Sequence, residues 1–562
     1  MNKLLLIFII SVFFRFLYLN VIPVSLAHDE IDNIIQSYSF IHTGTDIEGT
    51  WKPFRFLPNS AMMGELAPLI NAPLLSIFSQ SLLSSRATSA ILSSFYPLLI
   101  IVLLGTLGVP SAVATTSALL LAISPWHIIF SRTALEQPTS LFLYTLSWIF
   151  LANYFKSKKV DLKSIFNSIF FVLTYTFGFF SYHGFKFSLP ILTGVLVLYY
   201  AKYRSAKFNW LKVILPLLFI SLFFAHIFLN KSTYSSRSNE IIFSKTDSFT
   251  NEVDFSRRLS LAPTKLKAVF SNKYVSLAQA IGDKYLFAIS PELLFQHGEN
   301  NGAFALWTMG YLYLFTLPFL LFGLMSIFDT RRNDQLLILT LLILSPLASV
   351  IHTNNSYAFR SAIYFVLLNV VLAYGFVYSY QFVKTKLSLC KNWIYLLVGL
   401  LTFISVSHFS YLYYYVSPIN NSNSYFFSER IMAQYIKLSP DKKILVIDPQ
   451  PRYVFSGIIL NKSNVSSADM ASFNHQYSPT EDDTYQYGNV TVMRDCPQGD
   501  RLDYDTIIIA KGTLADATTC GNIKRKIAEN PESVNSLVSA KDGREERIII
   551  DDLLCKGIKL RS

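Results

Sequence analysis

The stretch VSLAHDEIDNIIQSYSF, residues 24–40, follows the first apolar segment and carries the first acidic residues of the chain. His28, Asp29, Glu30 and Asp32 lie within five residues of each other there. One interpretation is a soluble flank that stops a membrane helix from sliding. The other is a pair of catalytic carboxylates at a membrane surface. The two interpretations predict different surroundings for the cluster.

The composition is that of a membrane protein. Of 562 residues, 52% are apolar and only 15% are charged, whereas ordinary soluble domains have about 25% charged residues. Several apolar runs approach or exceed the roughly 20 residues that cross a bilayer as a helix. The net charge of +12 comes largely from short connectors between these runs. We therefore expect lipid phosphate, and no nucleic acid, as the anionic partner.

About eleven membrane helices are predicted, which makes the chain an α-helical polytopic protein. They are residues 3–22, 87–104, 111–129, 137–155, 164–182, 185–201, 210–229, 304–327, 335–351, 360–381 and 393–414. The first holds Arg15 and lacks a clear small-residue cleavage site, so we interpret it as an uncleaved helix and not as a signal peptide.

The charge of the connectors predicts the topology. Lys and Arg are concentrated near 156–163, 202–209, 329–334 and 384–392, and such short basic connectors belong on the cytoplasmic side. All four connectors fall on the cytoplasmic side if the N-terminus is cytoplasmic and the protein lies in the plasma (inner) membrane. Loops 23–86 and 230–303, and the tail, are then outside.

The apolar segment 66–83 would invert this pattern if it crossed the membrane. It contains Pro68 and Pro73, which make a poor spanning helix. We expect it to lie on the outer interface.

The sequence pattern of the C-terminal tail predicts a separate domain. KKILVIDP (442–449), TIIIAKG (506–512) and ERIIIDD (546–552) are typical of short buried strands, and 522–530 is polar and helical in pattern. We divide the chain into a transmembrane domain, 1–415, and a small extracytoplasmic α/β domain, 416–562. Cys496 and Cys520 are candidates for a disulfide in an oxidising compartment, which would leave Cys555 over.

The acidic cluster opens a predicted amphipathic helix along the outer interface. Its apolar face is Ile31, Ile34, Ile35, Tyr38 and Ile41. Asp29 and Glu30 lie in the first turn, where free amides and the helix dipole favour carboxylates. This placement alone requires no active site. We expect Asp32 on a solvated face.

Cations recur at the outer ends of other predicted spans. Arg132 lies near Glu136, a short turn carries His183 and Lys186, and His352 and Arg360 flank another turn. Each feature alone is compatible with an interfacial ion pair or with a snorkelling side chain.

Together, carboxylates and cations at one membrane face suit the transfer of a sugar from a membrane-held phosphate lipid. Arg or Lys would stabilise the departing phosphate. A carboxylate would orient the accepting hydroxyl and take its proton. A single in-line attack would invert the anomeric centre.

These residues resemble the polytopic GT-C glycosyltransferases, in particular bacterial relatives of the dolichyl-phosphate-mannose–protein mannosyltransferases (glycosyltransferase family 39). The resemblance covers roughly residues 1–381. It is carried by Arg15, by HDE at 28–30, by SRATSAILSSFYPLLI (85–100), ISPWHIIFSRTALEQ (123–137) and YLFAISPELLF (285–295), and by Gly310 to Tyr313 with Leu317 and Pro318.

The resemblance implies a polyprenyl-phosphate-linked monosaccharide donor, with Asp29 and Glu30 as the catalytic carboxylates. It implies that Arg132 and Glu136 support the active-site loop, with His28. On position and charge, Lys186, His183 and Arg360 are candidates for the donor phosphate.

The resemblance implies no metal, although Asp46 and Glu48 could contribute carboxylates to one. The tail matches nothing in the eukaryotic protein mannosyltransferases, so the acceptor stays open among glycan, lipid and protein. The alternative functions are a transporter or flippase of lipid-linked saccharides and a ligase or polymerase of them. Transporters place ionisable groups near the bilayer midplane, whereas here they gather at one face.

Overall fold

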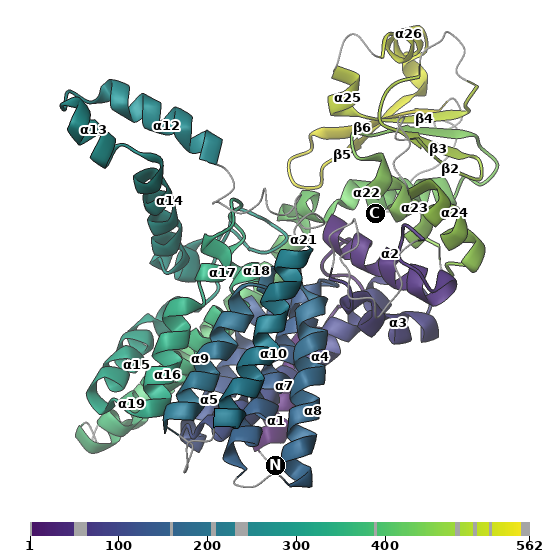
Figure 1. Cartoon of the computed structure of the whole chain (residues 1–562). Helices are drawn as coiled ribbons and strands as arrows, with labels where there is room; N and C mark the ends of the chain where they lie inside the picture. The colour runs from purple at the N-terminus through teal and green to yellow at the C-terminus, as the bar shows by residue number, and fades with distance from the viewer. Residues whose placement is uncertain are drawn as a thin grey trace.

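The computed structural model describes most of the chain. The described residues are 3–49, 64–157, 161–203, 210–230, 246–386, 391–462, 464–477, 484–497, 503–515 and 520–551. They form a helical bundle with an α/β domain at one end (Figure 1). This confirms the predicted fold class of a helical membrane protein with a small C-terminal α/β domain.

Every one of the eleven predicted segments contains a helix of the bundle. The helices are α1 (Lys3–Phe16), α4 (Leu82–Leu107), α5 (Ser111–Ile123), α6 (Pro125–Ser131), α7 (Glu136–Lys156), α8 (Leu162–Ser181), α9 (Ser188–Tyr203), α10 (Trp210–Leu229), α15 (Leu317–Thr330), α16 (Asn333–Leu344), α17 (Leu347–Val350), α19 (Ala362–Lys386) and α20 (Lys391–Tyr411). Within the described ranges, six helices are long and apolar enough to cross a membrane, or seven if the bent pair α5 and α6 is one span.

Two of the predicted segments are interrupted. Residues 111–129 bend by 58° between α5 and α6, because Pro125 begins α6 and Ser124 before it is extended at ψ 127°. The segment predicted from 304 becomes helical only at η4 (Leu314–Thr316). The loop before it includes Trp307 at φ 60°, a left-handed conformation that ends any helical run.

Described residues of two of the basic connectors, Arg332 and Ser157, bond to neighbouring segments at one end of the bundle. Arg332 donates from Nη2 to the carbonyl of Gly108 over 3.1 Å, and the Lys212 ammonium donates to the carbonyl of Ser157. The helices α2 (His28–Thr43) and α3 (Ala67–Ile77) and the α/β domain lie at the opposite end (Figure 1). We call this the α2 end.

The helix α3 is too short to span a bilayer. Its 11 residues extend about 16 Å at 1.5 Å per residue, against a hydrocarbon core of about 30 Å. It packs against α2 and α4, as expected for a segment that does not cross.

The helix α2 begins at His28 as predicted, but its polar face is not exposed. Every residue from Glu30 to Phe40 is buried, because α3 covers one side and α23 (Pro451–Leu460) and α24 (Ser467–Tyr477) of the α/β domain cover another. The prediction that Asp32 is solvated is wrong: it is only 5% exposed.

Three further helices, from the predicted loop 230–303, stand away from the bundle. They are α12 (Thr246–Leu259), α13 (Thr264–Phe270) and α14 (Lys273–Ala288), and they lie on the opposite side from the α/β domain (Figure 1). A short π-helical turn, η3 (Glu292–Gln296), leads from α14 back to the bundle.

The α/β domain is built on a six-stranded sheet of order β2-β3-β1-β4-β6-β5. The strands are β1 (Ile444–Ile447), β2 (Tyr485–Tyr487), β3 (Val490–Met493), β4 (Thr506–Ala510), β5 (Val534–Val538) and β6 (Glu545–Asp551). Strand β1 is parallel to β3 and β4, and the outer pairs are antiparallel. The three predicted strands are β1, β4 and β6, and the predicted helix is α26 (Gly521–Glu529).

The connecting helices of this domain complete the fold. The chain leaves α20 through η5 (Leu412–Val416), α21 (Ser417–Asn420) and η6 (Asn423–Tyr425), and enters the domain with α22 (Phe427–Lys437). Helix α25 (Lys511–Ala515) follows β4, and η7 (Pro531–Ser533) precedes β5.

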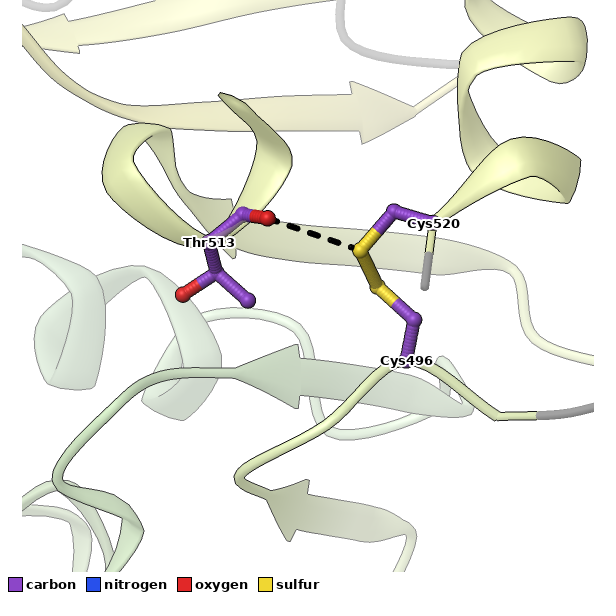
Figure 2. The surroundings of a disulfide bond; sticks show 3 residues. All are labelled: Cys496, Thr513 and Cys520. Carbon is purple, nitrogen blue, oxygen red and sulfur yellow. Dashed lines mark hydrogen bonds between the residues drawn. A yellow bond between two sulfur atoms is a disulfide. The ribbon is translucent and has the colours of Figure 1, made fainter. Parts of the chain in front are cut away.

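The predicted disulfide between Cys496 and Cys520 is present, with Cα atoms 5.3 Å apart (Figure 2). It ties the segment after β3 to the start of α26. The Sγ of Cys520 lies 3.6 Å from the carbonyl oxygen of Thr513. Cys555 lies outside the described residues.

Candidate functional site

The carboxylate of Glu30 fixes the start of α2. Its Oε1 accepts from Arg86 Nε over 3.0 Å and from the amide of Ala134 over 2.7 Å. Its Oε2 accepts from Arg86 Nη2 over 3.1 Å and from the amide of Ala27 over 2.9 Å. Both ionic side chains are 0% exposed. Glu30 therefore ties its own helix to α4 and to the loop before α7.

Arg86 completes this arrangement from the first turns of α4. It donates to the carbonyl of Pro23 over 2.8 Å and to that of Ser25 over 2.6 Å, besides pairing with Glu30. The Arg86 guanidinium thus binds both the Glu30 carboxylate and the backbone of the loop that precedes α2. Sequence reasoning did not single out Arg86, since a cation at the start of a span is usually a snorkelling residue.

Asp29 differs from its neighbours in exposure. His28 and Glu30 are buried, whereas the side chain of Asp29 is exposed. It lies in the first turn of α2, where amide groups without helical partners favour an ionised carboxylate. Asp29 is thus a carboxylate exposed to solvent at the start of α2.

The α/β domain packs onto this loop. The ring of His28 is stacked between those of Phe426 and Tyr453, with centroids 3.3 and 3.8 Å away. Asp32 accepts from Arg452 Nη2 over 2.9 Å and from the Tyr453 hydroxyl over 3.2 Å. Burial raises the pKa of Asp32 to about 6, and the charge of Arg452 opposes this rise.

Arg132 and Glu136 serve two different segments. The buried guanidinium of Arg132 donates to the carbonyls of Phe14 and Arg15, both over 3.0 Å, and to that of Ile22 over 2.9 Å. Arg132 therefore holds the end of α1 and the loop that connects α1 to α2.

Glu136 accepts a hydrogen bond from the amide of Gly64. A side chain at Gly64 would collide with the carbonyl oxygen of Ser181, 1.9 Å from an added Cβ, so the glycine is needed for this approach. Glu136 thereby anchors the segment that leads into α3.

Lys186 is placed differently from the expectation. Its ammonium is buried and donates to Glu65 Oε1 over 2.7 Å, and His183 Nε2 lies 3.9 Å from the same oxygen. A phosphate ligand needs an accessible cation, and this one is committed to a buried carboxylate. The geometry therefore does not support Lys186 as a donor-phosphate ligand. Glu65 carried no sequence pattern that would have predicted the pair.

Arg360 is partly exposed at the α2 end, in α18 (Tyr357–Arg360). Its Nη1 lies 2.7 Å from His352 Nδ1. The ammonium of Lys284, from α14, donates to the carbonyls of His352 and Thr353 over 2.9 and 3.1 Å. These contacts bring three basic side chains to one loop.

Beneath this loop lies Glu299, which is only 2% exposed. Burial raises its pKa to about 8, while the amide of Ala358, which donates to it, and the charge of Arg360 act in the opposite direction. Glu299 therefore lies close enough to Arg360 for the charge of Arg360 to act on its pKa.

Within the described ranges, no group of three or more His, Cys, Asp and Glu side chains is arranged to hold a metal ion. Of the two carboxylates considered for one, Asp46 accepts from the backbone amide of Glu48 through Oδ1 over 3.0 Å. Burial, and then the charge of Asp46, raises the pKa of Glu48.

No protein-family model matches the sequence, and no curated protein matches it. The structure is similar to that of ArnT from Cupriavidus metallidurans bound to undecaprenyl phosphate, with 12% identity over 99% of this chain and 98% of that one and a TM-score of 0.45. It is also similar to the archaeal oligosaccharyltransferase AglB from Archaeoglobus fulgidus in complex with an inhibitory peptide and a dolichol-phosphate. That match has 12% identity over 93% of this chain and 70% of that one, with a TM-score of 0.43.

A crystal structure of the Archaeoglobus fulgidus oligosaccharyltransferase with a tethered acceptor peptide matches 83% of this chain at 13% identity and a TM-score of 0.42. The chain spans 63% of the length of that protein. The sequence resemblance to GT-C glycosyltransferases is accompanied by these similarities, which concern the fold. The functional assignment rests on the chain's own residues.

Replacing Arg86 by Met should destabilise the protein by about 3–5 kcal/mol, because it leaves the Glu30 carboxylate buried without its counterion. The double variant Glu30→Gln/Arg86→Met should regain part of this loss. The measurement is the unfolding midpoint of the full chain in detergent.

The matched control is Arg544→Met, since Arg544 pairs with Asp542 over 3.5 Å and both side chains are exposed, at 86% and 37%. Such a pair is worth about 1 kcal/mol or less. Equal midpoints for Arg86→Met and the control would contradict the role of the buried pair.

Proposed function

We propose that the protein is an inverting glycosyltransferase that moves a monosaccharide from a polyprenyl-phosphate donor to an acceptor hydroxyl. One observation carries the proposal: Asp29 is exposed at the start of α2, while the adjacent Glu30 is buried and bonded through both oxygens. A partly exposed arginine, Arg360, lies at the same end of the bundle. This is the set of groups that a transfer from a lipid phosphate requires.

In the proposed reaction, Asp29 accepts the proton of the acceptor hydroxyl as its oxygen bonds to the anomeric carbon. The bond between that carbon and the phosphate oxygen breaks, and the electron pair leaves with the phosphate. Arg360 stabilises the negative charge that develops there. Because attack and departure occur on opposite faces of the anomeric carbon, the configuration inverts.

We assign Glu30 a positioning role in place of a catalytic one. Its oxygens already accept from Arg86, Ala27 and Ala134, so no lone pair is directed to a substrate. We likewise assign Lys186 and Glu65 to holding the turn after α8 against the loop before α3. Arg132, Glu136 and His28 support the loop, as the resemblance implies.

We further propose that the α2 end faces outward and the N-terminus lies in the cytoplasm. The support is that the described residues of two basic connectors, 156–163 and 329–334, lie at the opposite end. The disulfide in the α/β domain also suits an oxidising compartment. The acceptor would then be a glycan, lipid or protein of the cell envelope.

Asp29→Asn should lower kcat by about 100-fold or more, because the amide cannot accept the hydroxyl proton. Transfer from polyprenyl-phosphate sugars would be measured in proteoliposomes. The control is Asp283→Asn, an exposed carboxylate on α14, which should leave the rate unchanged. Near-normal turnover of Asp29→Asn would remove Asp29 from the mechanism.

Arg360→Ala should raise the KM for the donor about tenfold, since a charge-assisted hydrogen bond is worth about 1.5–3 kcal/mol. Arg331→Ala, an exposed arginine of the basic connectors, should leave that KM unchanged. The two variants would be compared by varying donor at fixed acceptor. An unchanged KM in Arg360→Ala would exclude it as the phosphate ligand.

A further inference from the structure

The α/β domain contacts residues that precede and follow Asp29 in the sequence. His28 on one side of it is stacked between Phe426 and Tyr453. Asp32, one helical turn further, pairs with Arg452. The exposed carboxylate therefore lies between two residues that a separate domain holds. These contacts join residues more than 390 positions apart in the sequence.

Tyr453 joins the two contacts. Its ring covers His28, its hydroxyl donates to Asp32 over 3.2 Å, and its own ring lies 4.4 Å beneath the Arg452 guanidinium carbon. Arg452 also donates from Nη1 to the Tyr477 hydroxyl over 3.0 Å. Both residues lie in the first turn of α23, directly after Pro451, so one helix start carries the contacts to Asp32 and to one face of His28.

The same loop is anchored to the sheet of the domain. His28 Nε2 lies 3.3 Å from Glu429, whose carboxylate is 3.5 Å from Arg547 on β6. Arg547 in turn donates to Asp448, directly after β1. The connection from His28 to the sheet thus runs through the buried side chains of Glu429, Arg547 and Asp448, which have few alternative arrangements.

The charges at the start of α2 make such a contact necessary. Asp29 and Asp32 are three residues apart and therefore share a face of the helix. Two ionised carboxylates there repel each other, and Asp32 is buried, so its charge needs a partner. The groups that face Asp32 are Arg452 and Tyr453 from α23 and His28 and Asp29 from its own helix. Arg452 is the cation among them whose charge does not depend on pH.

We propose that Arg452 and Tyr453 are positioning residues of the transfer reaction, and that the α/β domain is thereby part of the catalytic site. Arg452 compensates Asp32 and Tyr453 covers His28, so the first turn of α2 keeps Asp29 directed at the acceptor hydroxyl. This inference rests on the proposed function for its catalytic readout. The orientation of Asp29 itself does not depend on that function.

The kinetic test compares Arg452→Ala, Arg452→Lys and the double variant Asp32→Asn/Arg452→Ala in proteoliposomes. Arg452→Ala should lower kcat about tenfold or more, with the donor KM within about twofold, since positioning acts on the reacting geometry. Arg452→Lys should recover part of kcat because it restores the charge. The double variant should be more active than Arg452→Ala, because it removes the buried carboxylate left without a counterion.

The control is Lys511→Gln, which removes an exposed ion pair with Glu545 elsewhere in the α/β domain. It should keep wild-type kcat. If Arg452→Ala keeps wild-type kcat, or if the double variant is less active than Arg452→Ala, the positioning role is overturned.

A second measurement does not need activity. A spin label attached to Asp29→Cys, in a chain with Cys390→Ser and Cys555→Ser, reports the mobility of this position. Arg452→Ala and Tyr453→Ala should increase the mobility of the label, and Lys511→Gln should not. Unchanged mobility in both α23 variants would overturn the inference. Increased mobility of the label, together with no sugar transfer by the wild-type chain, would support the positioning of residue 29 and overturn the proposed function alone.

Discussion

The buried ion pair between Glu30 and Arg86 is the interaction on which the candidate site depends. Both side chains are inaccessible to solvent, and the same groups bind the backbone at Pro23, Ser25, Ala27 and Ala134. A buried charge is costly unless it is paired and hydrogen-bonded, so the loop has one arrangement that satisfies both ions. That arrangement starts α2 at His28 and leaves Asp29 as the exposed carboxylate.

The remaining charges at the α2 end divide into two kinds. Arg132 and Lys186 are buried, bind carbonyl or carboxylate oxygens and hold segments of the chain together. Arg360 is partly exposed, and the pKa of Glu299 beneath it is raised to about 8. The first kind holds segments of the chain together, and the second is accessible to an anionic ligand. This division supports our proposal that, at the membrane surface, an acceptor hydroxyl takes the sugar from a lipid phosphate while Asp29 accepts the proton of that hydroxyl.

Local patterns predicted the helices of the bundle, three of the strands and the disulfide, because apolar runs and buried Ile-rich segments carry their own signal. They did not predict the environment of Asp32, whose partner Arg452 is 420 residues away. Lys186 was assigned to phosphate for the same reason, since its partner Glu65 lies in a loop without periodicity. Position and charge in the sequence identify which side chains are candidates for binding a ligand. Only tertiary contacts decide which of these side chains are already paired within the protein.

The proposed reaction breaks the bond between the sugar and the lipid phosphate and forms a new glycosidic bond of inverted configuration. The most direct test uses the wild-type chain in proteoliposomes with a panel of polyprenyl-phosphate monosaccharides and cell-envelope acceptors. Our account predicts that free polyprenyl phosphate accumulates in equal amount to a product whose anomeric configuration, determined by NMR, is opposite to that of the donor. Movement of the intact lipid-linked saccharide across the bilayer, without release of polyprenyl phosphate, would contradict it.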